Sequence, residues 1–292
     1  MGETLAFKPG VPHTLHPVHY KHMTDERSQL RTTFNRVALL YDQVRPRYPE
    51  ALFEDVVSFS EITPDGRILE IGCGTGQATV PFARRGYRIL CIELGENLAT
   101  VAQKNLAAYP QVEVRNIAFE DWVTQENTFD LVISATAFHW LDPSIAYKKT
   151  AQALTSKGAI ALFWNVHVHS DASNGFFEEV QELYQSLAPQ LVKDDEPPLR
   201  EQKVPNKTSE IKQTGLFGEV TYRSYRWDAT YNSASYLNLL NTYSGHLNLD
   251  SITRARFFDA IAQLINTKFN GQITKGYLTT LYVAHLLKKF TN

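Results

Sequence analysis

The fold of this chain is decided by Ile68-Leu69-Glu70-Ile71-Gly72-Cys73-Gly74-Thr75-Gly76-Gln77. Here an apolar run that ends in an acid leads into a glycine-rich turn, and residues 78–83 then have a helical pattern. A strand that stops at such a turn brings bare backbone, without side chains in the way, to the end of a sheet. We therefore expect a ligand to lie against this turn.

The segments around the turn alternate between strand and helix patterns. Further strands are expected at 88–92, 112–116, 129–134 and 159–164, and helices at 34–44, 50–59, 78–83, 98–106 and 143–155. This alternation is typical of βαβ units, which build a mostly parallel sheet with helices on both faces. The predicted fold is therefore α/β, doubly wound and Rossmann-like.

The composition is that of an ordinary globular protein. Of 292 residues, 43% are hydrophobic and 21% are charged, and the formal net charge is −2. Lys and Arg are spread along the chain without a basic footprint for nucleic acid, and no apolar segment is long enough to span a bilayer. The two cysteines, Cys73 and Cys91, exclude a disulfide framework. We expect a soluble, cytoplasmic protein without nucleic-acid or membrane partners; its oligomeric state is not indicated.

Residues 1–28 have no apolar periodicity and contain several prolines, which predicts a flexible N-terminal arm. Four histidines recur there at every third residue: His13, His16, His19 and His22. In a polyproline II segment their rings would share one edge and could ligate a metal, but a solvated tail has the same composition. No metal site is predicted.

Residues 29–292 are predicted to form a single domain, with a core at 60–165, a substrate lid at 166–250 and a closing helix and strand at 251–292. Beyond Asn165 helices are expected near 175–188, 234–243 and 251–266, and strands at 219–227 and 277–284. Aromatic side chains are numerous in this part; some belong to the core and others could form the wall of an apolar acceptor site. They are Phe176, Phe177, Tyr184, Trp227, Tyr231, Tyr236 and Tyr243.

The spacing of the glycines limits the ligand. The dinucleotide fingerprint requires glycines at its first, third and sixth positions, whereas here the third glycine is at the fifth position and Gln77 occupies the sixth. Glu93 ends the next strand, where a carboxylate can accept hydrogen bonds from ribose hydroxyls. Nicotinamide and S-adenosylmethionine sites both use that carboxylate, so Glu93 indicates a nucleoside and does not distinguish these two.

The segment Leu69–Gly76 resembles the first motif of class I S-adenosylmethionine-dependent methyltransferases. Tyr41, Arg45-Pro46 and Tyr48-Pro49 upstream, together with Ala137-Phe138-His139-Trp140, are similar to a small-molecule subgroup that includes relatives of trans-aconitate methyltransferase. The likeness covers about residues 30–165 and is only general beyond them. It implies a seven-stranded sheet with an antiparallel last strand, helical lid insertions and S-adenosyl-L-methionine as the cofactor.

The resemblance also implies roles for residues. Gly72 and Gly74 would let the backbone approach the methionine part of the cofactor, Glu70 would order the turn from beneath, and Glu93 would hold the ribose. The remaining cofactor-binding residues implied by the pattern are Tyr41, Arg45, Gln77, Leu94, Asn97, Phe119, Glu120, Ser134 and Ala135. Arg45 could pair with the cofactor carboxylate. Ala118 stands where many relatives have an aspartate that binds adenine, so adenine recognition is expected to depend on backbone and packing.

His139 and Trp140 follow the fourth strand, at the rim where an acceptor would meet the methyl group. His139 is the candidate general base for a hydroxyl or carboxylic acid acceptor. In the alternative interpretation, His139 and Trp140 only shape the substrate pocket, because a carboxylate acceptor is already ionised and needs no base.

Three other functions stay open. A nucleic-acid methyltransferase is disfavoured by the charge and by Ser134–Trp140, which lacks the Asn/Asp-Pro-Pro-aromatic motif of base-amine enzymes. A non-catalytic binder of S-adenosylmethionine would share the same glycine turn. A nicotinamide oxidoreductase is disfavoured by the glycine spacing.

Overall fold

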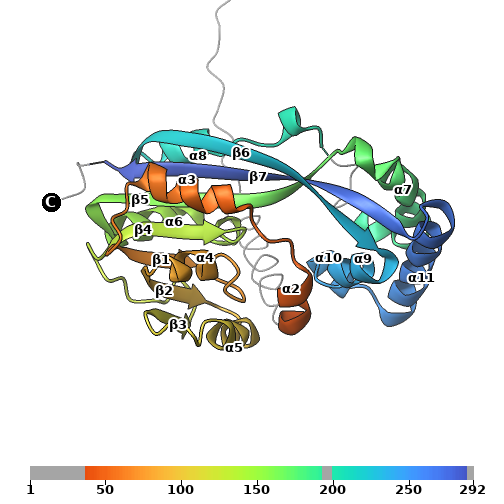
Figure 1. The fold of residues 1–292 in the computed structure, drawn as a ribbon, viewed down its shortest axis with the longest axis horizontal. Helices are drawn as coiled ribbons and strands as arrows, with labels where there is room; N and C mark the ends of the chain where they lie inside the picture. Colours follow the sequence, from red (N-terminus) through yellow and green to blue (C-terminus); the bar gives the residue numbers. More distant parts are fainter. Residues whose placement is uncertain (1–36, 193–198, 288–292) are drawn as a thin grey trace, which may run out of the picture.

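A single seven-stranded sheet forms the middle of the molecule in the computed structural model, which describes residues 37–192 and 199–287 (Figure 1). The strand order is β3-β2-β1-β4-β5-β7-β6. The strands are β1 (Arg67–Ile71), β2 (Arg88–Glu93), β3 (Val112–Asn116), β4 (Phe129–Ala135), β5 (Leu154–Val168), β6 (Phe217–Asn232) and β7 (Gln272–Leu286).

The first five strands are parallel, and β7 runs antiparallel to both of its neighbours, β5 and β6. The predicted doubly wound, mostly parallel sheet with an antiparallel last strand is therefore confirmed. β7 lies one place in from the edge, because β6 pairs along its outer side.

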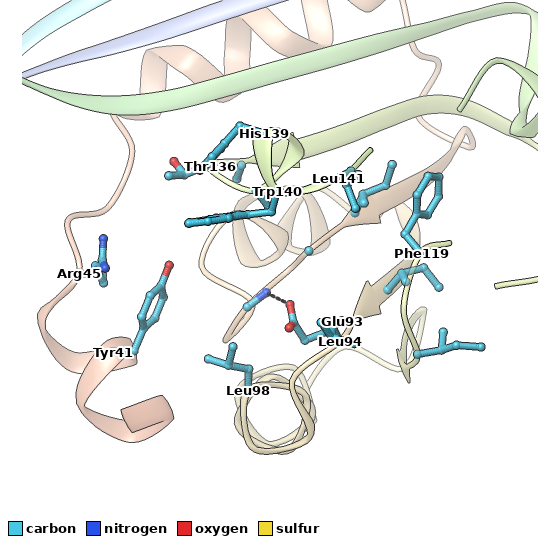
Figure 2. A pocket seen from close by; sticks show the side chains of 17 residues that line it. Tyr41, Arg45, Glu93, Leu94, Leu98, Phe119, Thr136, His139, Trp140 and Leu141 are labelled. Atoms are coloured by element: carbon cyan, nitrogen blue, oxygen red, sulfur yellow. Dashed lines mark hydrogen bonds between the residues drawn. The ribbon is translucent and has the colours of Figure 1, made fainter. Parts of the chain in front are cut away.

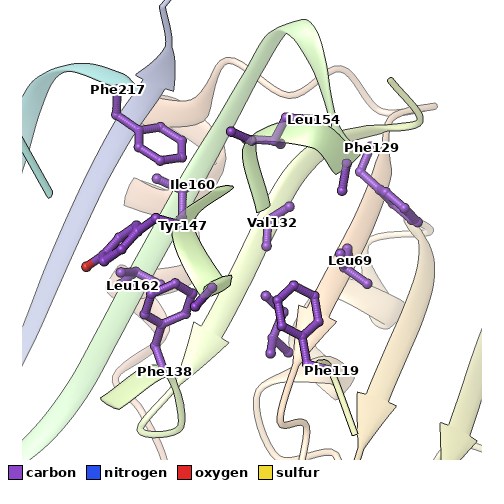
Figure 3. Packing of buried hydrophobic residues seen from close by; sticks show 14 of the residues in the cluster. Leu69, Phe119, Phe129, Val132, Phe138, Tyr147, Leu154, Ile160, Leu162 and Phe217 are labelled. Atoms are coloured by element: carbon purple, nitrogen blue, oxygen red, sulfur yellow. The ribbon is translucent and has the colours of Figure 1, made fainter. Parts of the chain in front are cut away.

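Helices cover both faces of this sheet, as the apolar strands require. One face packs against α3 (Glu50–Ser60), α4 (Thr79–Arg84) and α5 (Glu96–Asn105). The other packs against α6 (Pro143–Ala153) and α8 (Thr208–Gln213), and Figure 3 shows side chains of this second cluster between the strands and α6. The cluster includes Phe119 and Phe138, which anchor two loops at the carboxyl ends of the strands.

The helix α2 (Ala38–Val44) lies between α5 and the helices formed by residues 233–247 (Figure 1). Ala38 packs with Leu98 and Val101 of α5, and Tyr41 packs against this cluster. The helix ends because Arg45 precedes a proline and is extended, with φ −66° and ψ 137°. This extended link sends the chain from α2 toward α3.

The strands β5, β6 and β7 are longer than their apolar runs predict. β5 and β7 stay paired to Val168 and Gly276, and β6 and β7 to Asn232 and Gln272. The additional residues include many polar side chains, such as Asn165, Asp228 and Lys275, so hydrophobicity alone underestimates the lengths of these strands. These extensions carry the second part of the molecule away from the sheet core.

That second part is helical and is built from α7 (Phe176–Leu187), α9 (Ser233–Leu240), α10 (Ser244–Leu247) and α11 (Ser251–Lys268) (Figure 1). We refer to these helices as the lid, after the predicted role of this part. It has its own apolar cluster, which contains Phe176, Tyr184, Tyr236 and Phe257. Because α11 contributes to this cluster, the lid continues beyond residue 250. Within 37–192 and 199–287 no helix is long and apolar enough to cross a membrane.

Candidate active site

A pocket opens at the carboxyl ends of β1, β2 and β4, where the strand order reverses (Figure 2). Its volume is about 990 Å³ including the part that is open to solvent. This is the position at which doubly wound sheets bind ligands. Its lining residues are Tyr41, Arg45, Ile71, Gly72, Gly74, Ile92, Glu93, Leu94, Leu98, Ile117, Phe119, Ala135, Thr136, Ala137, His139, Trp140 and Leu141.

The glycine turn needs its glycines for two reasons. Gly72, Gly74 and Gly76 have φ values of +69°, +57° and +87°, a region that side chains disfavour. In addition, a Cβ atom on Gly72 would lie 2.6 Å from the Cβ atom of Ala137. The turn after β1 and the loop after β4 are thus in direct contact, with bare backbone facing the pocket.

Glu93, at the end of β2, is directed to this turn. Its Oε2 accepts a hydrogen bond from the backbone N–H of Gly74 (2.8 Å), and its Oε1 accepts one from Gly95 (2.8 Å). The dashed line in Figure 2 marks the first of these bonds. These two bonds orient the carboxylate at the wall of the pocket, where it could accept hydrogen bonds from a ribose. The site therefore fits a nucleoside.

Glu70 lies beneath the turn and is completely buried. Its Oε2 accepts a hydrogen bond from the Thr79 hydroxyl (2.6 Å), which ties β1 to the first residue of α4. Oε1 has no partner among the described residues. Burial raises the pKa of Glu70 to about 8, the Thr79 bond opposes that rise, and the charge of Glu93 adds to it. Glu70 is therefore protonated at neutral pH.

This protonation predicts a pH effect on stability. Because the pKa of Glu70 is raised on folding, from 4.5 to about 8, the folded state binds the extra proton, and that stabilisation is lost as pH rises toward 8. Urea denaturation gives the free energy of unfolding of wild type and of Glu70→Gln. Between pH 5 and 8 the value for wild type should fall relative to that of the variant by about 1.4 kcal/mol per pH unit. Glu113→Gln, an exposed control, should give a constant difference. Parallel curves for Glu70→Gln would refute this protonation.

Arg45 and Tyr41 form the side of the pocket next to the lid. The Arg45 guanidinium lies 4.9 Å from the ring centre of Tyr41 and 4.7 Å from that of Tyr243. It also donates to the backbone oxygen and the hydroxyl of Thr242, at 2.7 and 2.9 Å. Arg45 thus joins the end of α2 to the lid while it lines the pocket.

Another part of the pocket wall is an apolar slot that begins beside Tyr41. The predicted residues Leu94 and Phe119 lie there, and so do Leu98 and Ile117, which the sequence interpretation missed. Asn97 and Glu120 are outside the lining, and the backbone oxygen of Glu120 accepts a hydrogen bond from Lys149. Leu98 could have been found from its place on the inner face of its helix.

Two further predicted residues lie behind the lining. Ser134 is fully buried, and its hydroxyl donates to the backbone oxygen of Ile71 (2.8 Å), so it joins the ends of β4 and β1. The Gln77 side-chain amide donates to the backbone oxygen of Asp42 (3.3 Å), which ties the glycine turn to α2. Ala135 does line the pocket.

Thr136 is a pocket residue that the sequence interpretation missed. It is β-branched and yet has φ +53°, a conformation that such residues rarely adopt. Its hydroxyl is within hydrogen-bond distance of the Tyr48 hydroxyl (2.7 Å), and its backbone N–H donates to the backbone oxygen of Phe163 (2.8 Å). These bonds hold the loop after β4 against β5 and against the link between α2 and α3.

His139 and Trp140 both line the pocket, and in Figure 2 Trp140 lies between Arg45 and Phe119. The indole N–H of Trp164 donates to Nδ1 of His139 (3.1 Å). In the neutral ring the proton is therefore on Nε2, which makes that nitrogen a donor and not a base. The short 3₁₀ turn Phe138–Trp140 is anchored by the buried Phe138, whose ring centre lies 4.8 Å from that of Tyr147.

Comparison with known proteins agrees with this geometry. Residues 69–162 match the methyltransferase domain family. An uncharacterised methyltransferase of Mycobacterium tuberculosis is 27% identical over 161 residues, which are 55% of this chain and 62% of that protein. A malonyl-[acyl-carrier protein] O-methyltransferase of Geobacter sulfurreducens is 29% identical over 169 residues, 55% of this chain and 59% of that protein.

Among solved structures, a protein from Anaeromyxobacter dehalogenans described as a type II methyltransferase has a TM-score of 0.57 at 21% identity, covering 82% of this chain and 97% of that one. This likeness concerns the fold. The chain spans a little under two thirds of the curated relatives it matches. The family match supports S-adenosylmethionine as the cofactor. The likeness to relatives of trans-aconitate methyltransferase stays a prediction.

Proposed function

We propose that this protein is an S-adenosylmethionine-dependent methyltransferase that acts on a small molecule bound between the core and the lid. One observation carries the proposal: the Glu93 carboxylate is oriented by Gly74, in a pocket at the strand-order reversal of a methyltransferase domain. The carboxylate would hold the ribose hydroxyls, and the slot formed by Leu94, Ile117 and Phe119 would take the adenine.

The rest of the pocket suits the other end of the cofactor. Bare backbone at Gly72 and Gly74 would lie along the methionine part, and the Arg45 guanidinium would attract its carboxylate. When bound, the cofactor supplies an electrophilic methyl group, and its sulfur keeps the electron pair of the broken carbon–sulfur bond. The chain's own contribution is to hold the acceptor atom in line with that methyl group.

His139 would position the acceptor in this reaction. Since Trp164 donates to Nδ1, the Nε2–H of His139 can donate to an acceptor oxygen at the rim of the pocket. A carboxylate acceptor needs no base, and transfer to it releases no proton. The malonyl relative is named as an O-methyltransferase, which is compatible with an oxygen acceptor.

A transfer assay with methyl-labelled S-adenosylmethionine tests the proposal. The panel should contain small carboxylic acids, phenols, amines and total RNA, with S-adenosylhomocysteine release measured in parallel. The expected result is label in a small organic product. Cofactor binding without transfer to any of the compounds would favour the non-catalytic binder, and label in RNA would overturn the small-molecule acceptor.

A further inference from the structure

A lysine is buried beneath the lid, near the start of β7 and away from the cofactor-binding core. Lys275 is only 5% exposed. Its Nζ lies 5.5 Å from the ring centre of Phe177, 5.6 Å from that of Tyr243 and 5.8 Å from that of Tyr277. Phe177 belongs to α7 and Tyr243 to the link between α9 and α10, so lid residues cover the ammonium group.

Lys275 has no counterion in the part of the chain that the structure describes. Across residues 37–192 and 199–287 its ammonium makes no ion pair and no hydrogen bond. Asp228, one register position away, lies against Gly276, and successive side chains of a strand point to opposite faces. A buried ammonium without a carboxylate is costly, and aromatic rings offset only part of that cost.

Near Lys275, His167 has a second buried polar atom without a hydrogen-bond partner among the described residues. It pairs in register with Tyr277, and its ring centre lies 4.4 Å from that of Phe177. Its Nε2 is buried without a hydrogen-bond partner among the described residues. Burial, and then the charge of Lys275, lower the pKa of His167 to about 2, so the ring is neutral and can donate one hydrogen bond.

Two phenols lie beside Lys275 and His167. The hydroxyls of Tyr231 and Tyr277 are 3.1 Å apart, and burial raises the pKa of both phenols, which keeps them protonated. Among the described residues, the charged side chains that shift the pKa of Tyr231 and of His167 are Arg45 and Lys275, which are both cations.

Lys275 and the pocket-lining Arg45 lie on either side of the Tyr243 ring. Arg45, which lines the pocket, and Lys275 both lie against the ring of Tyr243, at 4.7 and 5.6 Å from its centre. Tyr243 thus separates the two cations, one on the cofactor side and one beneath the lid. A flat acceptor that extends from the pocket along Tyr243 and Tyr277 would reach the ammonium with its far end.

We propose that Lys275 and His167 form a subsite that binds an anionic group, a carboxylate or a phosphate, at the end of the methyl acceptor remote from the reacting atom. This inference rests on the proposed function. An anion would supply the missing counterion of Lys275 and accept a hydrogen bond from the neutral His167 ring. An acceptor with an ammonium group would be repelled by Lys275 and Arg45.

Binding of paired probes tests this subsite in protein saturated with S-adenosylhomocysteine. Each pair consists of an anion and a neutral compound: trans-cinnamate with its amide, and phenyl phosphate with benzyl alcohol. Their binding is measured by ligand-detected NMR titration. Wild type should bind each anion at least about tenfold more tightly than its neutral partner. The anion that binds more tightly shows whether the subsite prefers a carboxylate or a phosphate. Equal affinity for both members of both pairs would overturn the proposal.

Variants then assign that preference to Lys275. Lys275→Met should reduce the anion preference to about twofold or less, whereas Lys275→Arg should keep it. Lys268→Met removes an exposed lid lysine and should leave the preference unchanged. A preference that survives in Lys275→Met would show that the ammonium only packs against the rings.

Two controls separate folding and cofactor binding from this subsite. The affinity for S-adenosylhomocysteine, measured by calorimetry, should stay within about twofold of wild type in all three variants. In the wild type, adding trans-cinnamate should shift the ring resonances of His167, and unchanged resonances would count against the subsite even where Lys275→Met does not fold. Failure of wild type to bind S-adenosylhomocysteine would instead refute the proposed function.

Discussion

Glu93→Gln should weaken S-adenosylhomocysteine binding at least about 100-fold, which corresponds to about 3 kcal/mol. The carboxylate accepts one backbone N–H on each oxygen, from Gly74 and from Gly95. An amide has a single acceptor oxygen, so its NH₂ group would face one of these N–H groups. Hydrogen bonds to a charged group contribute about 1.5–3 kcal/mol each, and those expected from the ribose would be weakened as well. Isothermal titration calorimetry measures the loss.

The matched control is Glu113→Gln, a carboxylate on the neighbouring strand that is 60% exposed and paired with Arg115. Its affinity for S-adenosylhomocysteine should equal that of wild type. Circular dichroism should show that both variants keep their folded spectra. An affinity in Glu93→Gln within a few fold of wild type would remove Glu93 from the cofactor site.

Gly72→Ala should both destabilise the protein and abolish cofactor binding. The positive φ of +69° costs about 1–2 kcal/mol for any residue with a Cβ atom. The new atom would also lie 2.6 Å from the Cβ atom of Ala137, and such overpacking adds about 1–3 kcal/mol. The free energy of unfolding from urea denaturation, together with calorimetry, checks both effects.

Two variants separate these costs. Gly86 has φ +90° and open space around its Cβ position, so Gly86→Ala should show only the backbone cost of about 1–2 kcal/mol. In the double variant Gly72→Ala with Ala137→Gly, the clash disappears and part of the stability should return. If Gly72→Ala is no less stable than Gly86→Ala, the contact between the two loops is not as close as the structure has it.

The fold of the core followed from the sequence because its strands are buried on both faces. Runs such as those ending at Glu70 and Glu93 are almost continuously apolar, and the glycine turn marks where the first of them stops. The antiparallel last strand came from the family resemblance. The lengths of β5, β6 and β7 did not follow, because polar residues such as Asn165, Asp228 and Lys275 interrupt the apolar pattern of their extensions.

The candidate site was predictable where it depends on the chain near the glycine turn. Ten of the predicted residues line the pocket, and they include Tyr41, Gly72, Glu93 and His139. Thr136 was not found, because its role arises from a left-handed backbone and from Tyr48, which is distant in sequence. Lys275 was not found either, since an isolated lysine in a strand pattern normally indicates a solvated face.

The hydrogen bond from Trp164 favours a positioning role for His139. From the sequence, this residue was the candidate base, with pocket shaping as the alternative. The bond from Trp164 connects residues 25 positions apart and places the proton on the other ring nitrogen. That partner could not be chosen from the sequence, because Trp164 lies at the end of a different strand.

The central claim is that the glycine turn and Glu93 hold S-adenosylmethionine and not a dinucleotide. A calorimetric titration of the wild-type chain with S-adenosylhomocysteine, and separately with NADH, tests it directly. We expect saturable binding of S-adenosylhomocysteine at one site per chain and no binding of NADH. Binding of NADH without binding of S-adenosylhomocysteine would contradict it.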